Sequence, residues 1–346
     1  TDSLGPAMNW ITPPGFAHPH YINPEISPED QPDRSYATRA KLKATGPLEI
    51  ENWDLVTDRI RNFFQRDELL ITNTAPRGEG YSLCVSCGII EPTYLDAGGT
   101  SGTHLKPYPT KKDHTCAGYS TSGLVLGTVF VADILLISFN VERPVNLQTH
   151  FLASKIALRT ISESLSLAGA RLLDIDPEEL QAEFRPAQSH RGHAGLEAEI
   201  YLYDTLSGGA GFAQSIGRLG LKLYETALEI LDECPDNCDR SCYRCLRSYK
   251  NKLDHHNLDR HLGASLLRHL MGIDEDVILP LKRTSNAAEK LIADLIQTEN
   301  CGATFTLNAA ISLTGIGELN VPILATLNGK NIIIGISGPL TPGHTT

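Results

Sequence analysis

The chain has 346 residues, a formal net charge of −11 and a hydrophobic share of 41%, which is ordinary for a globular protein. This length predicts two or three cores, and the acidic balance excludes a protein that coats nucleic acid with its whole surface, because phosphate binding needs concentrated Lys and Arg. No stretch reaches the roughly 20 uncharged apolar residues of a membrane-spanning helix, so we expect a cytoplasmic protein that does not engage a membrane.

The first 48 residues are rich in Pro, His and Asp and show little periodicity, which predicts an extended arm. We expect a helix over residues 53–65, because Leu55, Ile60 and Phe63 or Phe64 can share one face, and then a strand over 81–86. The apolar, β-branched stretch over 120–144 predicts one or two buried strands. The remaining expected elements are a helix over 147–168 that Gly169 can end, a strand over 199–205, a glycine turn at 207–211, helices over 212–231, 258–271 and 286–298, and strands over 303–307 and 321–336.

Four cysteines crowd into twelve residues late in the chain, with the spacing C-x3-C-x3-C-x2-C. They are Cys234, Cys238, Cys242 and Cys245. This spacing lets four thiolates converge on one Zn²⁺ at about 2.3 Å each, and the surrounding Pro, Asn, Asp and Ser residues favour the turns that this requires. The alternative is a redox disulfide pair, which a cytoplasmic setting disfavours.

A second cysteine set lies upstream, where Cys84 and Cys87 form C-x-x-C and Cys116 follows after a loop. Three thiols need a fourth ligand to close a zinc site, and either His114 or His104 can supply an imidazole. We take His114, two residues before Cys116, as the first choice. Two zinc ions are therefore expected, and a saturated zinc site of this kind shapes the protein without catalysing a reaction.

The late cysteines run directly into a basic segment that also contains tyrosines. A metal-pinned loop with arginines and tyrosines suits the clamping of phosphates and the stacking of bases in a single strand. The equal alternative is a solvated face that offsets the negative charge of a zinc–thiolate centre. The candidate nucleic-acid-binding residues are Arg240, Arg244, Arg247, Lys250, Tyr243 and Tyr249.

The segments LGTVFVADILLISF, YDTLSGGAGFA and CDRSCYRCLRSYKNKLDHHNLDR together resemble the zinc-binding C-terminal domain of MrfA-type superfamily-two DNA helicases and of related antiphage proteins from DISARM and Druantia systems. The resemblance covers about residues 10–271, and its last segment is the most specific. It implies that the four late cysteines hold zinc. It also implies a role beside an ATP-driven helicase motor, in the same or a partner chain, that acts on DNA in repair or phage defence.

The motor itself is absent from this sequence, which has no G-x-x-x-x-G-K-[ST] phosphate loop and no DEAH-like run. SGGAG at 207–211 lacks the Lys of such a loop, so its glycines indicate a tight turn and close packing rather than an anion site. Without a catalytic motif, we expect an accessory domain that supports nucleic-acid binding. The alternatives are a protein-interaction scaffold that docks on a motor or partner, and a metal-dependent nuclease built on Glu318 and Lys330.

Alternating strands and helices predict a mixed α/β architecture in three parts. Residues 1–48 form a Pro-rich arm, and residues 49–272 form a zinc-stabilised, helicase-associated domain that contains both cysteine sets. Residues 273–346 form a small α/β extension that stops soon after an apolar run. Because the chain also starts without an initiator methionine, we expect it to be a piece of a longer polypeptide.

Overall fold

The computed structural model describes residues 9–14, 38–42, 53–75, 78–93, 102–187, 195–273, 281–297, 302–313, 315 and 317–341. Helices and sheets combine in this part of the chain, which confirms the predicted mixed α/β class. Most of the predicted arm over 1–48 lies outside the described residues. Two of its described pieces are strands that join the main sheet, namely β1 (Trp10–Ile11) and β2 (Thr38–Leu42).

The main sheet is built around two long strands, β4 (Ile60–Asn73) and β9 (Ser120–Asn140), which pair antiparallel along the whole of β4. On the other side of β9 follow β11 (Glu197–Asp204) and the edge strand β10 (Leu180–Pro186), so the order is β10-β11-β9-β4-β2. β1 pairs with β9 in parallel. The shorter strands are β3 (Asp54–Thr57), β5 (Tyr81–Cys84), β6 (Ile90–Pro92), β7 (His104–Leu105) and β8 (Thr115–Cys116).

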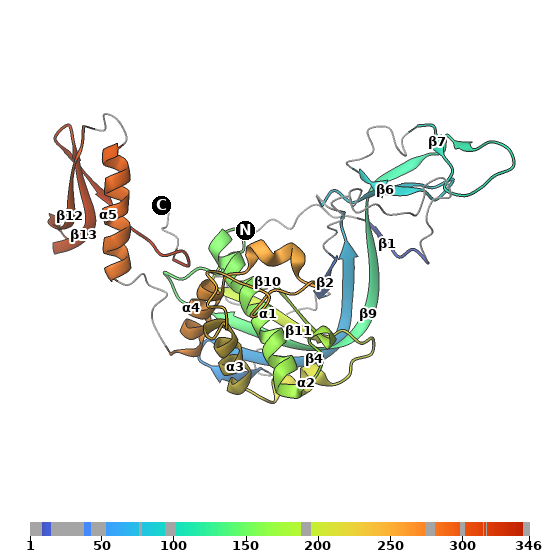
Figure 1. Cartoon of the computed structure of the whole chain (residues 1–346), viewed down its shortest axis with the longest axis horizontal. Coiled ribbons are helices and arrows are strands. Elements are labelled where there is room, and N and C mark those ends of the chain that lie inside the picture. Colours follow the sequence, from blue (N-terminus) through green and yellow to red (C-terminus); the bar gives the residue numbers. More distant parts are fainter. Residues whose placement is uncertain are drawn as a thin grey trace.

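Helices cover one face of this sheet (Figure 1). α1 packs against both α3 and α4 and also contacts β10 and β11. The helices of the described chain are α1 (Leu152–Leu173), α2 (Phe212–Gly217), α3 (Leu221–Asp232), α4 (Arg260–Met271) and α5 (Leu281–Gln297), and the 3-10 turns η4 (Pro177–Glu179) and η5 (Lys252–Asn257) flank β10 and α4.

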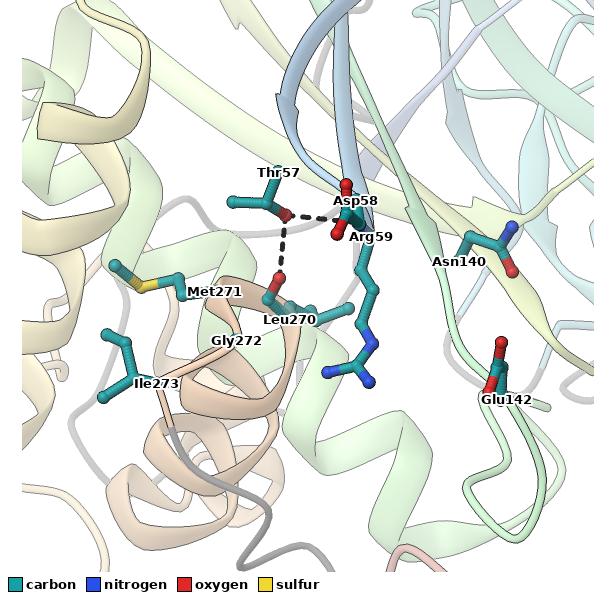
Figure 2. Close-up of a pocket in the computed structure, with 9 residues that line it drawn as sticks. All are labelled: Thr57, Asp58, Arg59, Asn140, Glu142, Leu270, Met271, Gly272 and Ile273. Atoms are coloured by element: carbon teal, nitrogen blue, oxygen red, sulfur yellow. Dashed lines mark hydrogen bonds between the residues drawn. The ribbon is translucent and has the colours of Figure 1, made fainter.

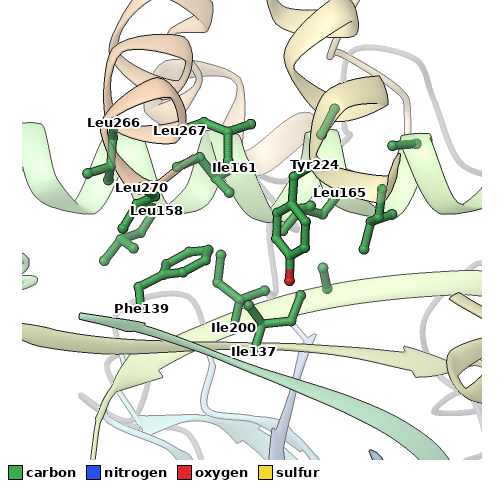
Figure 3. Packing of buried hydrophobic residues seen from close by; sticks show 14 of the residues in the cluster. Ile137, Phe139, Leu158, Ile161, Leu165, Ile200, Tyr224, Leu266, Leu267 and Leu270 are labelled. Atoms are coloured by element: carbon green, nitrogen blue, oxygen red, sulfur yellow. The ribbon is translucent and has the colours of Figure 1, made fainter. Parts of the chain in front are cut away.

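The core lies between the sheet and these helices, as Figure 3 shows. Alternate residues of a strand point to opposite faces. Ile137 and Phe139 of β9 therefore face the helices, where they meet residues such as Leu158 and Leu266. Leu136, the residue before Ile137, belongs to a smaller cluster on the other face. Burial on both faces explains why the sequence of β9 is nearly continuous in apolar residues.

β4 and β9 continue beyond the helical layer and curve away from it (Figure 1). Their far ends carry β5 and β6, and the small β7–β8 sheet lies at the same end. The upstream cysteine set therefore lies at the tip of an arm formed by β4 and β9, away from the helices. This arm is distinct from the Pro-rich segment over 1–48.

A separate unit at the C-terminal end combines α5 with the antiparallel sheet β12-β13-β14. Its strands are β12 (Thr304–Leu313), β13 (Gly317–Leu327) and β14 (Lys330–Ile334). After β14 the chain returns to the main body, where the carbonyl of Leu340 accepts a hydrogen bond from the N–H of Asn146 at 3.1 Å and the Leu340 side chain joins the main core.

The expected helix over 53–65 is wrong, because this segment forms β3 and the first part of β4. Ile60 and Phe64 share a helix face, but they also share a strand face, together with Asn62. Pairing along β9 decides between the two periods, and the aromatic and β-branched residues of the segment favour a strand.

Two of the predicted helices differ from the structure in the role of their glycines. The helix expected over 147–168 begins at Leu152 and continues through Gly169 to Leu173. A Cβ at Gly169 would lie 2.7 Å from the Cδ1 of Ile216, so this glycine permits close packing of α1 on α2 instead of ending α1. The helix expected over 212–231 is divided into α2 and α3 at a short stretch with two glycines, which have poor helix propensity.

Candidate functional site

The four late cysteines form a compact tetrad in the loop that connects α3 to η5. The Sγ atoms of Cys234 and Cys238 lie 3.5 Å apart, as do those of Cys234 and Cys242. The Sγ of Cys245 lies 3.7 Å from both Cys238 and Cys242, and all four sulfurs lie within 4.8 Å of one another. Four thiolates at about 2.3 Å from one Zn²⁺ are roughly 3.8 Å apart, so this donor set fits a tetrahedral zinc ion.

The backbone of the loop stabilises negative charge on these sulfurs. The N–H of Cys242 donates to the Sγ of Cys245 at 3.2 Å, and the N–H of Arg244 donates to the Sγ of Cys242 at 3.4 Å. Burial acts to raise the pKa of the Cys234 thiol, but hydrogen bonds from the backbone at Cys238 and Asp236 outweigh it and lower that pKa to about 6. Burial raises the pKa of the Cys238 and Cys245 thiols, so the loop favours one thiolate by itself and needs a bound cation to hold four.

Arg260, the first residue of α4, is buried and hydrogen-bonds to the tetrad loop. Its guanidinium donates to the carbonyl of Cys238 at 2.7 Å and to the side-chain oxygen of Asn237 at 2.9 Å. It also donates to the carbonyls of Leu231 and Asp232, the last residues of α3, at 3.2 Å each. One side chain thus joins α3, α4 and the metal loop. Our sequence analysis missed Arg260, although it lies in the LDR that ends the family-like segment.

A buried charge cluster anchors the segment after the tetrad. Arg159 of α1 pairs with Glu163 at 2.6 Å, with Glu183 of β10 at 2.9 Å and with Asp254 of η5 at 3.4 Å. Burial alone would lower the pKa of Arg159, but the three carboxylates raise it. Asn251 adds a hydrogen bond to Glu163 at 3.0 Å. These residues were also missed: Asn251 and Asp254 lie in the family-like segment, but their partners in α1 and β10 are distant from it in sequence.

Three of the six candidate nucleic-acid-binding residues make contacts within the protein. The Nζ of Lys250 donates to the carbonyl of Leu180 at 3.0 Å, and burial lowers the pKa of this lysine. Arg247 donates to the Oγ of Ser241 at 2.9 Å. Arg240 pairs with Asp259 at 3.2 Å, although its side chain is still 48% exposed.

The other three candidates face solvent. Tyr243 is 68% exposed and meets the ring of His255 edge-on at 5.3 Å, and Tyr249 is 79% exposed. The side chain of Arg244 is 66% exposed, and its ion pair with Asp236 is long, at 3.9 Å. An exposed arginine on the same loop as two exposed aromatic rings can contact phosphate, and the rings can stack on bases.

The structure brings the upstream cysteines together with His104 and not with His114, which corrects our first choice of fourth ligand. The Nε2 of His104 lies 3.2 Å from the Sγ of Cys87, and the sulfurs of Cys84 and Cys116 are 3.8 Å apart. His114 is exposed, and its Nδ1 lies 3.3 Å from the hydroxyl of Thr110. The β7–β8 pairing explains the difference, because it places His104 directly opposite Cys116.

The SGGAG turn has no free amide cradle for an anion. The carboxylate of Asp204 accepts hydrogen bonds from the N–H groups of Ala210, Phe212 and Ala213 at 2.7–3.1 Å. A Cβ at Gly209 would lie 2.3 Å from Asp133, so this glycine is needed for close approach. The turn therefore permits close packing and is not an anion site, as we expected from its lack of a lysine.

The two residues of the nuclease alternative lie far apart. Glu318 is near the start of β13, opposite Ser312, whereas Lys330 begins β14, opposite Leu327. Leu327 lies nine residues further along β13 than Glu318, which is about 30 Å in a strand. Among the described residues, the sets that could share a metal are the tetrad and the upstream set, so the geometry gives no support to this alternative.

A pocket of about 690 Å³ opens beside the end of α4 (Figure 2). Thr57 donates to the carbonyl of Leu270 at 2.9 Å, and Arg59 donates to that of His269 at 2.7 Å, so both side chains cap the end of α4. The pocket contains no member of either cysteine set, and Arg59 is already hydrogen-bonded to the end of α4. Its lining residues are Thr57, Asp58, Arg59, Asn140, Glu142, Leu270, Met271, Gly272 and Ile273.

Comparisons with known proteins agree with this geometry. Residues 161–246, which include the tetrad, match the family model of the MrfA Zn-binding domain. The chain is 28% identical to the Druantia protein DruE of Escherichia coli (strain UMEA 4076-1) over 347 aligned positions, which cover 92% of this chain and 17% of that protein. Residues 161–246 are therefore similar to a zinc-binding domain of the MrfA type.

The solved structures that resemble this chain include two of the DUF1998 helicase MrfA, both at 14% identity. The structure bound to DNA gives a TM-score of 0.39 over 68% of this chain and 25% of that one. The structure bound to DNA and AMPPNP gives 0.29 over 61% and 23%. Within the described ranges, no helix has the length and apolar character that crossing a membrane requires.

Proposed function

We propose that this chain, part of which is similar to a zinc-binding domain of the MrfA type, is an accessory part of a helicase or translocase that acts on DNA. The chain spans 17% of the length of its Druantia relative, so the ATP-driven motor lies elsewhere in the same polypeptide or in a partner chain. The relative's name supports antiphage defence as the setting, with DNA repair as the alternative. We expect the helicase or translocase to act in the cytoplasm.

The metal part of this proposal assigns zinc to the tetrad Cys234, Cys238, Cys242 and Cys245. A zinc ion held by four thiolates has no open position for water or substrate, so it fixes the fold and supplies no Lewis-acid step. The ion would hold together the cysteine-bearing part of the loop, whose contacts with the body include those of the buried residues Arg260 and Leu246. The proposal also includes a second zinc ion at the upstream set.

The nucleic-acid part of the proposal rests on one observation: Tyr243, Arg244 and Tyr249 are all exposed on the loop that the tetrad organises. We propose that Arg244 contacts phosphate and that the two tyrosines stack on bases of a single strand. Arg240 can add a phosphate contact from its exposed side. Arg247, whose Nε donates to Ser241, and Lys250, whose ammonium donates to the carbonyl of Leu180, help to hold the shape of this surface.

The test is a titration of a fluorescently labelled oligo(dT) with the zinc-loaded chain, followed by anisotropy at several salt concentrations. Arg244→Ala should weaken binding about 5-fold or more and lower the salt dependence by about one phosphate contact. Tyr243→Ala and Tyr249→Ala should weaken binding with little change in salt dependence, because each stacked base contributes about 1–3 kcal/mol. Arg218→Ala is the matched control, since Arg218 is exposed but lies at the other end of α3.

Undetectable binding at low salt, or equal losses for Arg244→Ala and Arg218→Ala, would refute the nucleic-acid part.

The scaffold alternative is favoured by the net charge of −11 and by Asp236 and Asp239 beside the tetrad. It predicts no oligonucleotide binding together with stable co-purification of the motor region. A tetrad variant such as Cys242→Ser would then abolish that co-purification.

A further inference from the structure

We propose that Cys84, Cys87, Cys116 and the Nε2 of His104 bind a zinc ion that serves as the core of the arm tip. The arm tip comprises residues 81–93 and 102–119, at the far end of β4 and β9 (Figure 1). This inference deepens the metal part of the proposed function by naming the fourth ligand and what the ion does there. It stands on the geometry of residues outside the matched zinc-binding domain.

The donor atoms have the arrangement that zinc requires. The sulfurs of Cys84 and Cys116 are 3.8 Å apart, close to the roughly 3.8 Å expected for two thiolates on a tetrahedral zinc ion. The same distance is far too long for a disulfide, whose S–S bond is about 2.05 Å. The Sγ of Cys87 lies 3.2 Å from the Nε2 of His104, and all four donors lie within 4.8 Å of one another.

Groups behind the donors orient them. The Nδ1 of His104 lies 3.0 Å from the carbonyl of Gly102. A carbonyl can only accept, so Nδ1 carries the proton and Nε2 presents its lone pair toward the sulfurs, as is usual for a metal-binding histidine. The N–H of Gly118 donates to the Sγ of Cys116 at 3.3 Å, which stabilises a thiolate. Both features prepare the site for a cation.

The arm tip has little apolar core that could replace the metal. Its buried apolar cluster consists of the three cysteines and Ile89. Two of its larger apolar side chains face solvent, since Val85 is 61% exposed and Tyr119 is 75% exposed, whereas the buried Tyr81 hydrogen-bonds to Asn73 of β4. A zinc ion would therefore supply the cohesion that hydrocarbon packing supplies in the main body.

The strand pairing of β7 and β8 also indicates that the arm tip needs a metal ion. The β7–β8 pair forms a sheet of its own and is not hydrogen-bonded to the main sheet. Two-stranded sheets are marginally stable alone. A metal ion bound by His104 of β7, by Cys116 of β8 and by the two cysteines of the β5–β6 turn would tie this pair to the end of the arm. His114 cannot do so, because its side chain is exposed and directed to Thr110.

The experiment combines zinc content by mass spectrometry with hydrogen exchange of the whole chain. Wild type should hold about two zinc ions, and His104→Ala and Cys242→Ser about one each. His114→Ala is the matched control and should still hold two. In His104→Ala, peptides from 81–90 and 103–118 should exchange at least tenfold faster, whereas peptides of α1 and β11 should keep the wild-type rate.

The unchanged exchange of α1 and β11 distinguishes a lost metal site from a misfolded chain. Cys116→Ser provides a second variant with the same expected result. One zinc ion in wild type, loss of zinc in His114→Ala, or a native mass showing oxidised cysteines would overturn the inference. None of these readouts involves nucleic acid, so failure of single-strand binding would count against the proposed function and leave this metal site intact.

Discussion

The buried guanidinium of Arg260 offers the sharpest test of how the tetrad loop is held. Arg260→Ala removes hydrogen bonds to four acceptors, on Cys238, Asn237, Leu231 and Asp232. A hydrogen bond from a charged donor contributes about 1.5–3 kcal/mol, and relaxation and entering water recover part of the sum. We therefore expect a loss of about 3 kcal/mol.

This loss should appear as weaker zinc binding. A small zinc loop orders as it binds its metal, so the bonds of Arg260 to the loop form together with the metal–sulfur bonds. Three kcal/mol then corresponds to roughly a hundredfold rise in the zinc dissociation constant. The assay is competition with a chromophoric chelator, carried out in a Cys116→Ser background so that only the tetrad is measured.

Arg268→Ala is the control, because Arg268 lies on the same helix and pairs with Asp232 at 2.5 Å, but at the surface. Exposed ion pairs contribute about 0–1 kcal/mol, so this variant should change zinc affinity less than fivefold. Equal effects of the two substitutions would refute the reasoning that burial makes Arg260 important.

Two further substitutions test the body that supports the loop. Arg159→Met leaves the carboxylates of Glu163, Glu183 and Asp254 buried without their cation, so the free energy of unfolding should fall by about 3–5 kcal/mol in urea titrations. Arg171→Met, on the exposed last turn of the same helix, should cost less than about 0.5 kcal/mol, and a similar cost for both would contradict the prediction. Gly169→Val places side-chain atoms against Ile216 and should cost about 1–3 kcal/mol, seen as a lower melting temperature. Adding Ile216→Ala should restore part of it, and strictly additive losses would show that the two residues do not compete for space.

Much of the site follows from local sequence, because its ligands are close along the chain. The tetrad spans twelve residues, and turn-forming residues between the cysteines leave few ways to fold that do not bring the thiols together. The strand β9 was equally evident, since its β-branched, apolar run fits a strand buried on both faces. The mixed α/β class follows from the same periodicities.

The errors occurred where two patterns coincide or where distant segments meet. Ile60 and Phe64 fit both a helix and a strand, and only pairing with β9 selects the strand. The choice between His104 and His114 also depended on pairing, because the β7–β8 register places one imidazole opposite Cys116 and leaves the other in solvent. Spacing along the chain could not distinguish them.

The sequence alone determines the local chemistry of this protein. Four cysteines able to bind one cation, and an aromatic, basic segment beside them, are close along the chain, so no long-range contact is needed to recognise them. Which cations are free to meet a ligand and which are hydrogen-bonded within the protein is a different matter. Arg244 and Lys250 look alike in the sequence, yet one faces solvent and the other donates to the carbonyl of Leu180. Packing of the loop against η4 and β10 makes that distinction, because it depends on segments about 70 residues away.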